Sequence, residues 1–256
     1  MEDEQPMTQG IETAQGFGWR KLLTFASLGA AVAIALVSVF IFKSADPPFI
    51  VMFVLFVVGG ILASRTGKAG VVGIALSTIG AAMFAAFAGP FAFQVIGIPA
   101  AKDEFIPVLS ILTLALTILI SAFVLAVRGR GRGFVPSRGA RGVGMVAAVL
   151  VVLIVGSSLY ASSKIKSVGA EASDVLLVAE DYEFVADKLS VDAGTVSVHV
   201  TNRDDASHTF TITELGVDLL VPVGKSTRVT FTAEAGEYRF YCKPHNPDME
   251  GKLTVS

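Results

Sequence analysis

The chain has 256 residues, of which 53% are hydrophobic and only 16% are charged, and its mean hydropathy is +0.67. Soluble domains usually contain about 25% charged residues, so this composition excludes a wholly soluble protein. The formal net charge of −2 is small and both signs are sparse, which argues against nucleic acid as a partner. A single cysteine excludes an internal disulfide.

The composition changes along the chain. Residues 22–160 contain long apolar runs, whereas residues 161–256 have the composition of an ordinary globular domain. We therefore expect a multi-domain chain with an N-terminal α-helical membrane bundle and a C-terminal all-β domain. The predicted boundaries are a disordered cytoplasmic tail at 1–21, a transmembrane domain at 22–160, a polar linker at 161–173 and a globular domain at 174–256.

Five apolar runs in the first half are candidates for transmembrane helices, because a bilayer core requires about 20 apolar residues in a helix. None of the five contains Asp, Glu, Lys, Arg or His. The first is longer than the apolar part of a signal peptide, so we expect it to remain uncleaved. We predict about five spans, with four or six as alternatives, at Leu22–Phe42, Phe49–Ser64, Ala69–Phe93, Pro107–Val127 and Val143–Tyr160.

Basic residues gather before the first run and in every second loop after it. Cationic flanks stay on the cytoplasmic side of a membrane. With five spans, all three basic groups lie on one side, which predicts a cytoplasmic N-terminus and an extracytoplasmic C-terminal domain. The three groups are Arg20 and Lys21; Arg65 and Lys68; and Arg128, Arg130, Arg132, Arg138 and Arg141.

Glycines are dense in the second and third runs. Small residues allow helices to approach each other closely in lipid, so these positions predict a tightly packed bundle. A path for a small molecule or an ion is the alternative. The glycines are Gly59, Gly60, Gly67, Gly70, Gly73 and Gly80.

The C-terminal domain shows the period-two alternation of β-strands, interrupted by turn signals such as Ala193-Gly194 and Ala235-Gly236. Short alternating strands at this spacing predict an all-β sandwich or barrel. The clearest strands are Thr195–Asn202, His208–Ile212, Arg228–Ala233 and Tyr238–Cys242.

Alternation also predicts which side chains point into the core. Cys242 shares a face with Phe240, and His208 shares a face with Phe210, so both Cys242 and His208 are expected to point inward. His199 lies on the face opposite its three neighbouring valines, and we expect it on the surface.

The only cysteine stands among residues that bind metals. His245 and Met249 follow Cys242 in the next loop, and His208 comes from a separate strand. Two imidazoles, a thiolate and a weak thioether form the ligand set of an electron-transfer copper site. Structural zinc prefers four strong ligands, so the thioether favours copper.

These residues resemble the cupredoxins, and especially their plastocyanin- and amicyanin-like branch. The resemblance covers Asp174 to Ser256 and rests on the spacing His-x33-Cys-x2-His-x3-Met. It also rests on Asn-x-Asp before the first histidine, Gly-x-Tyr-x-Phe-Tyr-Cys, and Met-x-Gly-x-Leu-x-Val. Where plastocyanin-like sequences have Asn after the first histidine, this chain has Thr209, whose hydroxyl is a candidate for the same bracing role.

The resemblance implies a small Greek-key β-sandwich that binds one type 1 copper ion. The ligands carried over are His208, Cys242, His245 and Met249. The family implies a blue copper protein that transfers single electrons between redox partner proteins, a donor and an acceptor. An arginine-rich inner loop on a multi-pass chain suggests the cytoplasmic membrane of a prokaryote.

In this family the histidine of the ligand loop is the usual electron port, which here is His245. Pro244 and Pro247 are expected to frame a small apolar docking patch near solvent. Tyr241, on the outward face beside Cys242, is a possible second route.

Two other functions remain open at this stage. In the first alternative, the domain is a copper-handling protein, such as a chaperone or a sensor. In the second, the bundle belongs to a membrane transporter or respiratory complex that the copper domain serves. We do not expect an enzyme, because multicopper oxidases and copper nitrite reductases need more histidines than the three present.

Overall fold

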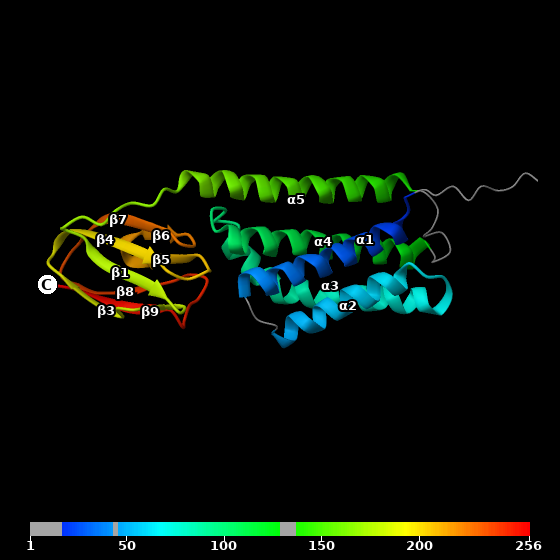
Figure 1. Cartoon of the computed structure of the whole chain (residues 1–256), viewed down its shortest axis with the longest axis horizontal. Helices are drawn as coiled ribbons and strands as arrows, with labels where there is room; N and C mark the ends of the chain where they lie inside the picture. Colours follow the sequence, from blue (N-terminus) through cyan, green and yellow to red (C-terminus); the bar gives the residue numbers. More distant parts are fainter. Residues whose placement is uncertain (1–16, 43–45, 129–136) are drawn as a thin grey trace, which may run out of the picture.

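A computed structural model describes residues 17–42, 46–128 and 137–256. Figure 1 shows the helices side by side and a β domain against one end of them. The predicted N-terminal tail lies almost wholly outside the described residues, as do Arg130 and Arg132 of the predicted arginine-rich loop. The expected fold class, a helical part followed by an all-β part, is confirmed.

The structure has helices at all five predicted apolar runs. Of these, α1, α3, α4 and α5 are long and apolar enough to cross a membrane, α1 together with part of η1. At about 1.5 Å per residue, the 17 residues of α2 span about 25 Å, short of a hydrocarbon core of about 30 Å. The helices are α1 (Trp19–Val37), continued by a π-helical turn η1 (Ser38–Phe42), α2 (Pro47–Ala63), α3 (Gly67–Val95), α4 (Lys102–Arg128) and α5 (Arg138–Lys164).

Helices α2 and α3 are packed backbone to backbone through small residues. A Cβ atom added at Gly73 would lie 2.1 Å from the backbone nitrogen of Ala63, and one added at Gly59 would lie 2.6 Å from Oγ of Ser77. Neither position has room for a side chain. The prediction that glycines permit tight packing here is confirmed.

The β domain consists of two sheets packed face to face. One sheet has four strands in the order β2-β1-β4-β7, and the other has five in the order β3-β9-β8-β5-β6. The strands are β1 (Val175–Glu180), β2 (Glu183–Phe184), β3 (Lys188–Val191), β4 (Gly194–Asn202), β5 (His208–Ile212), β6 (Val217–Val221), β7 (Ser226–Ala233), β8 (Gly236–Tyr241) and β9 (Glu250–Val255).

The four strands predicted from alternation correspond to β4, β5, β7 and β8. Between the two sheets lies a core of fully buried side chains, led by Leu177, Val198, Phe210, Phe240 and Leu253. Phe210, Phe240 and the nearby Phe184 pack together: the ring centroid of Phe240 lies 5.3 Å from the centroids of both Phe184 and Phe210. This aromatic cluster stabilises the packing of β5, which carries Phe210, and β8, which carries Phe240.

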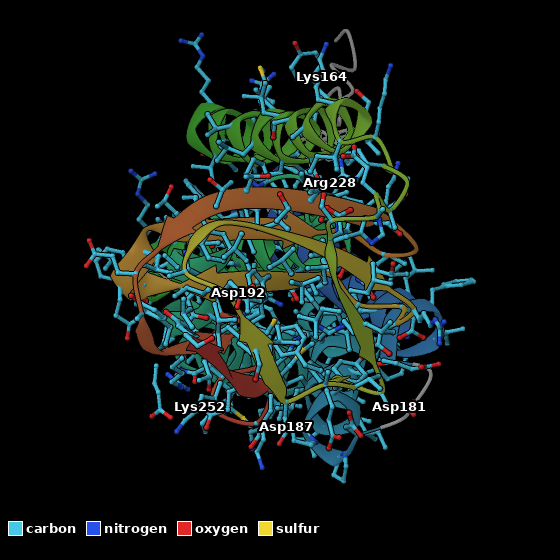
Figure 2. The ribbon with its side chains drawn as sticks, turned by 90° about the vertical axis from the view of Figure 1, so that its left-hand side faces the viewer. Lys164, Asp181, Asp187, Asp192, Arg228 and Lys252 are labelled. Atoms are coloured by element: carbon cyan, nitrogen blue, oxygen red, sulfur yellow. The ribbon has the colours of Figure 1, made fainter. Side chains whose placement is uncertain are left out.

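The predicted linker does not run free between the two parts. Helix α5 continues to Lys164, and the following residues lie against the four-stranded sheet, where the Val168 backbone N–H donates to the carbonyl of Ser226 (3.0 Å). Arg228 of β7 donates to the carbonyl of Gly169 at 2.8 Å. Figure 2 shows Arg228 on the upper sheet and Lys252 on the opposite one.

The prediction of a surface His199 is wrong. The side chain does point away from the core, but it is only 6% exposed. Its Nε2 lies 3.0 Å from the carbonyl oxygen of Val168, because the linker covers this face of the sheet. Alternation within a strand cannot reveal a cover that comes from another part of the chain.

The β domain is tied to the helices at the N-terminal end of α4. Ser207 donates from its backbone N–H to Asp103 Oδ2 (2.6 Å) and from its hydroxyl to Asp103 Oδ1 (2.5 Å). Because Ser207 precedes the first residue of β5, this contact places that strand's start next to the helix ends.

Candidate metal centre

Strand ends and one loop bring the predicted ligands together. His208 is the first residue of β5, Cys242 follows the last residue of β8, and His245 and Met249 lie in the loop that leads to β9. His208, Cys242 and Met249 are fully buried, and His245 is partly buried. We refer to these four residues as the metal centre.

Three donor atoms of the metal centre converge on one point. His208 Nδ1 lies 3.1 Å from His245 Nδ1. Cys242 Sγ lies 3.3 Å from His245 Nδ1 and 3.7 Å from His208 Nδ1. A triangle with these sides has a centre about 2 Å from each corner, close to the metal–nitrogen and metal–sulfur bond lengths of about 2.0–2.3 Å known from zinc sites. Without any rearrangement, the residues fit a metal ion.

The backbone of the ligand loop closes on itself. The N–H of Met249 donates to the carbonyl of His245, and the N–H of Cys242 donates to the carbonyl of Met249, both at 2.9 Å. The loop therefore brings Met249 back beside Cys242, and both side chains pack in the same buried cluster. A thiolate, two imidazoles and a nearby thioether are the donor set of type 1 copper.

Thr209 braces the thiolate side of the site. Its backbone N–H donates to Cys242 Sγ at 3.3 Å. Its hydroxyl oxygen accepts a hydrogen bond from the backbone N–H of Lys243 at 2.8 Å. Through these two hydrogen bonds, Thr209 joins the start of β5 to the beginning of the ligand loop.

Asp204 orients His208 and was missed as a site residue. Its Oδ2 lies 2.7 Å from His208 Nε2, so the other ring nitrogen, Nδ1, is directed at the metal position. Metal-binding histidines usually make such a bond to a carboxylate, which fixes the tautomer and the ring. The sequence signal was the Asn-x-Asp motif, in which Asn202 Oδ1 accepts from the N–H of Asp204 (2.8 Å).

Tyr182 covers both imidazoles and had no signal in the sequence. Its ring lies edge-on to His245 and His208, with centroid distances of 5.1 Å and 5.9 Å. Asp181 and Tyr182 have φ angles of 56° and 62°, a left-handed backbone conformation that residues other than glycine rarely adopt. The Asp204 carboxylate stabilises this turn by accepting from both backbone N–H groups, at 2.7 Å and 3.1 Å.

Burial prepares the two imidazoles to bind a cation. Burial, with a smaller contribution from a charged His208, lowers the pKa of His245 to about 4. Burial also lowers the pKa of His208, although Asp204 opposes it. Both rings are therefore neutral at pH 7. Burial raises the pKa of the Cys242 thiol to about 11 in the absence of metal, so this group ionises only when an ion takes the proton's place.

We predict that binding of Cu(II) releases about one proton per ion, and that the apparent affinity rises about tenfold per unit between about pH 6 and pH 8. The affinity for copper increases with pH because the metal-free thiol is protonated over this whole range, whereas the metal-bound sulfur is not. Calorimetry in buffers of different ionisation enthalpy measures the release. No proton release would mean that Cys242 is not a ligand.

Replacing Asp204 tests the orienting bond. We expect Asp204→Ala to weaken copper binding by about 10- to 100-fold, because His208 loses the partner that fixes its ring. Competition with a chelator measures the affinity. Asp205→Ala, the same change at the next residue, is the control and should change it little; equal effects at both positions would contradict an orienting role for Asp204.

Known proteins resemble the C-terminal part of this chain. Residues 146–255 match a protein-family model described as a cupredoxin-like domain. Among solved structures, the chain is similar to an amicyanin from Paracoccus versutus, at 22% identity and a TM-score of 0.29, over 34% of this chain and 85% of that one. Mutant amicyanins in reduced and Cu(I) forms match at 22% and 20% identity, with TM-scores of 0.29 and 0.31, over 34% and 36% of this chain and 86% and 90% of theirs.

Proposed function

We propose that the protein is a membrane-anchored carrier of single electrons, because the C-terminal part of this chain is a cupredoxin-like domain attached to apolar helices. In this proposal the four residues of the metal centre hold one copper ion. The ion, once bound, supplies the one-electron chemistry, and the protein residues supply a fixed set of ligands for both oxidation states.

One observation carries the proposal: three donor atoms of the right kinds lie 3.1–3.7 Å apart, two of them on fully buried side chains and the third on the partly buried His245. Bonds from Thr209, Asp204 and Met249 restrain the segments that carry these atoms. A site held in this way changes little when an electron arrives or leaves, which favours rapid transfer.

Burial of the ligands favours an electron carrier over a copper-handling protein. Transfer of copper between proteins requires an incoming ligand to reach the ion, whereas His208, Cys242 and Met249 have no exposed surface. In the carrier proposal, copper stays bound through many redox cycles, and exchange with a soluble chelator is slow compared with reduction.

The proposed electron routes leave the metal centre on two sides. Pro244 and His245 border a cavity shared with the helices, whereas Pro247 is exposed. Tyr241 lies on the outer face of β8, with the Arg239 guanidinium 4.7 Å from its ring centre. We assign His245, with Pro244 and Pro247, to one route and Tyr241 to a second, so that the electron donor and the electron acceptor can dock at different places.

We also propose that the β domain lies outside the cytoplasmic membrane and the N-terminus inside. The start of α1 and the connection between α2 and α3 lie at the end of the bundle far from the β domain (Figure 1). These segments carry Arg20, Arg65 and Lys68, and the positive-inside rule assigns such basic flanks to the cytoplasm. Protease added to intact spheroplasts should remove residues 174–256 and spare the helices. Protection of the β domain until the cells are lysed would reverse this orientation.

Optical and electron paramagnetic resonance spectra of the copper-loaded full chain test the electron-carrier function. We expect an intense blue band that disappears on reduction with ascorbate and returns on reoxidation, with no loss of copper. A colourless Cu(II) form, or copper lost within one cycle, would contradict the proposal and favour copper handling.

A further inference from the structure

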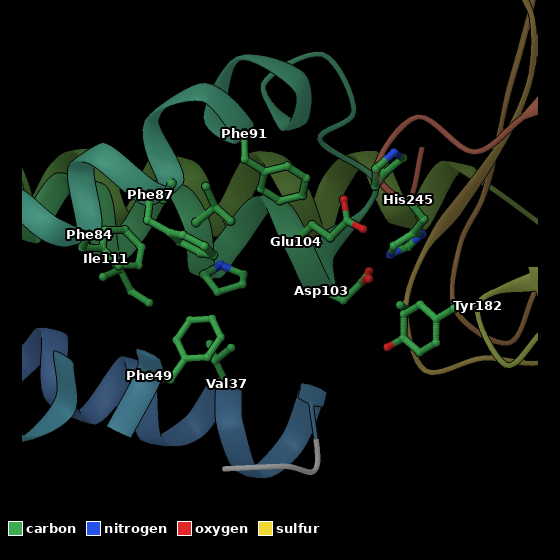
Figure 3. A pocket seen from close by; sticks show the side chains of 15 residues that line it. Val37, Phe49, Phe84, Phe87, Phe91, Asp103, Glu104, Ile111, Tyr182 and His245 are labelled. Carbon is green, nitrogen blue, oxygen red and sulfur yellow. The ribbon is translucent and has the colours of Figure 1, made fainter. Parts of the chain in front are cut away.

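A cavity of ≈ 380 Å³ lies between the helices and the β domain, with His245 of the metal centre in its wall. Most of its lining is apolar and includes Phe49 of α2 and Phe84, Phe87 and Phe91 of α3. Asp103, Glu104, Tyr182 and His245 lie together at the end nearest the β domain (Figure 3). We call this space the junction cavity.

We propose that the junction cavity binds a hydroquinone with an apolar tail, a lipid-soluble reductant that reaches it from the bilayer. This inference rests on the proposed function for its redox part, because the electron goes to the copper beside His245. The inference that a hydroquinone binds depends only on the size and lining of the junction cavity.

The size and lining of the junction cavity suit such a ligand. Sites for small molecules usually have volumes of about 300–1,000 Å³, mostly apolar walls and a few polar groups that set the orientation. The rings of Phe49 and Phe87 meet edge to face, with centroids 6.1 Å apart, which offers an aromatic ligand the contact geometry that rings prefer.

Glu104 indicates the chemistry of the polar end. Its Oε2 is buried and has no hydrogen-bond partner among the residues that the structure describes. A buried polar atom without a hydrogen-bond partner is unfavourable, so a ligand that supplies the partner gains affinity. The neighbouring Asp103 is already engaged by Ser207, so a hydroxyl group arriving in the cavity has Glu104 as its partner.

A hydroquinone explains these features better than a lipid acyl chain does. An acyl chain would fill the aromatic part of the cavity but leave Glu104 unpartnered. A hydroquinone places its ring among phenylalanines and a hydroxyl at Glu104. It also brings the electron donor beside His245, whose Nδ1 faces the metal position.

The redox step balances one electron at a time. The bound hydroquinone gives one electron to Cu(II) and one proton to water or a carboxylate at the polar end. It gives up a second electron and a second proton after a partner protein, the oxidant, has taken the first electron away. Quinone then leaves to the bilayer.

Binding of decyl-benzohydroquinone to the copper-free full chain in detergent tests the site without any electron transfer. We expect saturable binding of one molecule per chain, measured by equilibrium dialysis. Ala88→Trp, which fills the cavity, should weaken it at least tenfold, whereas Ala86→Trp on the exposed face of the same helix should not. Glu104→Leu should also weaken it at least tenfold.

Three outcomes would overturn the inference: no saturable binding, equal losses in both tryptophan variants, or displacement by palmitate as strongly as by the quinone, which would make the cavity a lipid site. Copper-loaded protein separates this inference from the proposed function. If ascorbate bleaches the site but decyl-benzohydroquinone neither binds nor reduces it, the junction-cavity proposal alone fails. If the hydroquinone binds but no reductant bleaches the site, the electron-carrier proposal fails.

Discussion

Cys242→Ser should abolish the blue absorption band and electron transfer completely. The band requires a copper–thiolate bond, and Cys242 is the chain's only cysteine. A serine hydroxyl ionises far less readily than a thiol and is a poor ligand for Cu(I). Titration of the variant with Cu(II), followed by its visible spectrum, measures the effect.

Met249→Leu is the matched control for Cys242→Ser. It also removes one sulfur atom from the metal centre, but it removes the weak axial ligand, so the blue band should persist while the reduction potential changes. Retention of the band in Cys242→Ser would contradict the ligand assignment, whatever the control shows.

Phe240→Ala should lower the free energy of unfolding of the β domain by about 3–5 kcal/mol. The ring is fully buried and contacts both Phe184 and Phe210, so its removal leaves a cavity beside Cys242. Since domains are usually stable by only about 5–15 kcal/mol, this loss is severe. Denaturant titration of the copper-free full chain, monitored by hydrogen exchange of the amides in the β-strands, measures this loss.

Phe231→Ala provides the comparison for Phe240→Ala. Phe231 packs against the same core but is only partly buried, and the same truncation there should cost clearly less. Equal losses at both positions would show that the cluster beneath the metal centre is not the main source of the domain's stability.

Cys242, His245 and Met249 of the metal centre could be predicted from the sequence because they lie close together in one loop, whereas His208 lies on another strand and was identified from the spacing typical of the family. Alternation places Phe240 and Cys242 on one face, and three residues after Cys242 comes His245 in the adjoining loop. The Gly251 of the Met-x-Gly-x-Leu motif has an equally local reason, since a Cβ there would lie 2.3 Å from Cζ of Phe240. Features of this kind can be predicted because they depend on residues that are close together in the sequence.

What the sequence could not reveal depends on contacts between distant segments. The cover over His199 comes from the linker, and Tyr182 reaches the imidazoles from a turn more than 20 residues before His208. The expected solvent-facing patch around His245 is instead partly walled by α3 and α4. No pattern within a single helix or strand specifies how two domains meet.

X-ray absorption at the copper edge of the loaded full chain tests the central claim most directly. We expect one short copper–sulfur bond and two copper–nitrogen bonds of about 2 Å in both oxidation states, with little change between them. A coordination shell of nitrogen and oxygen atoms without a short sulfur bond would contradict the account of this protein as an electron carrier.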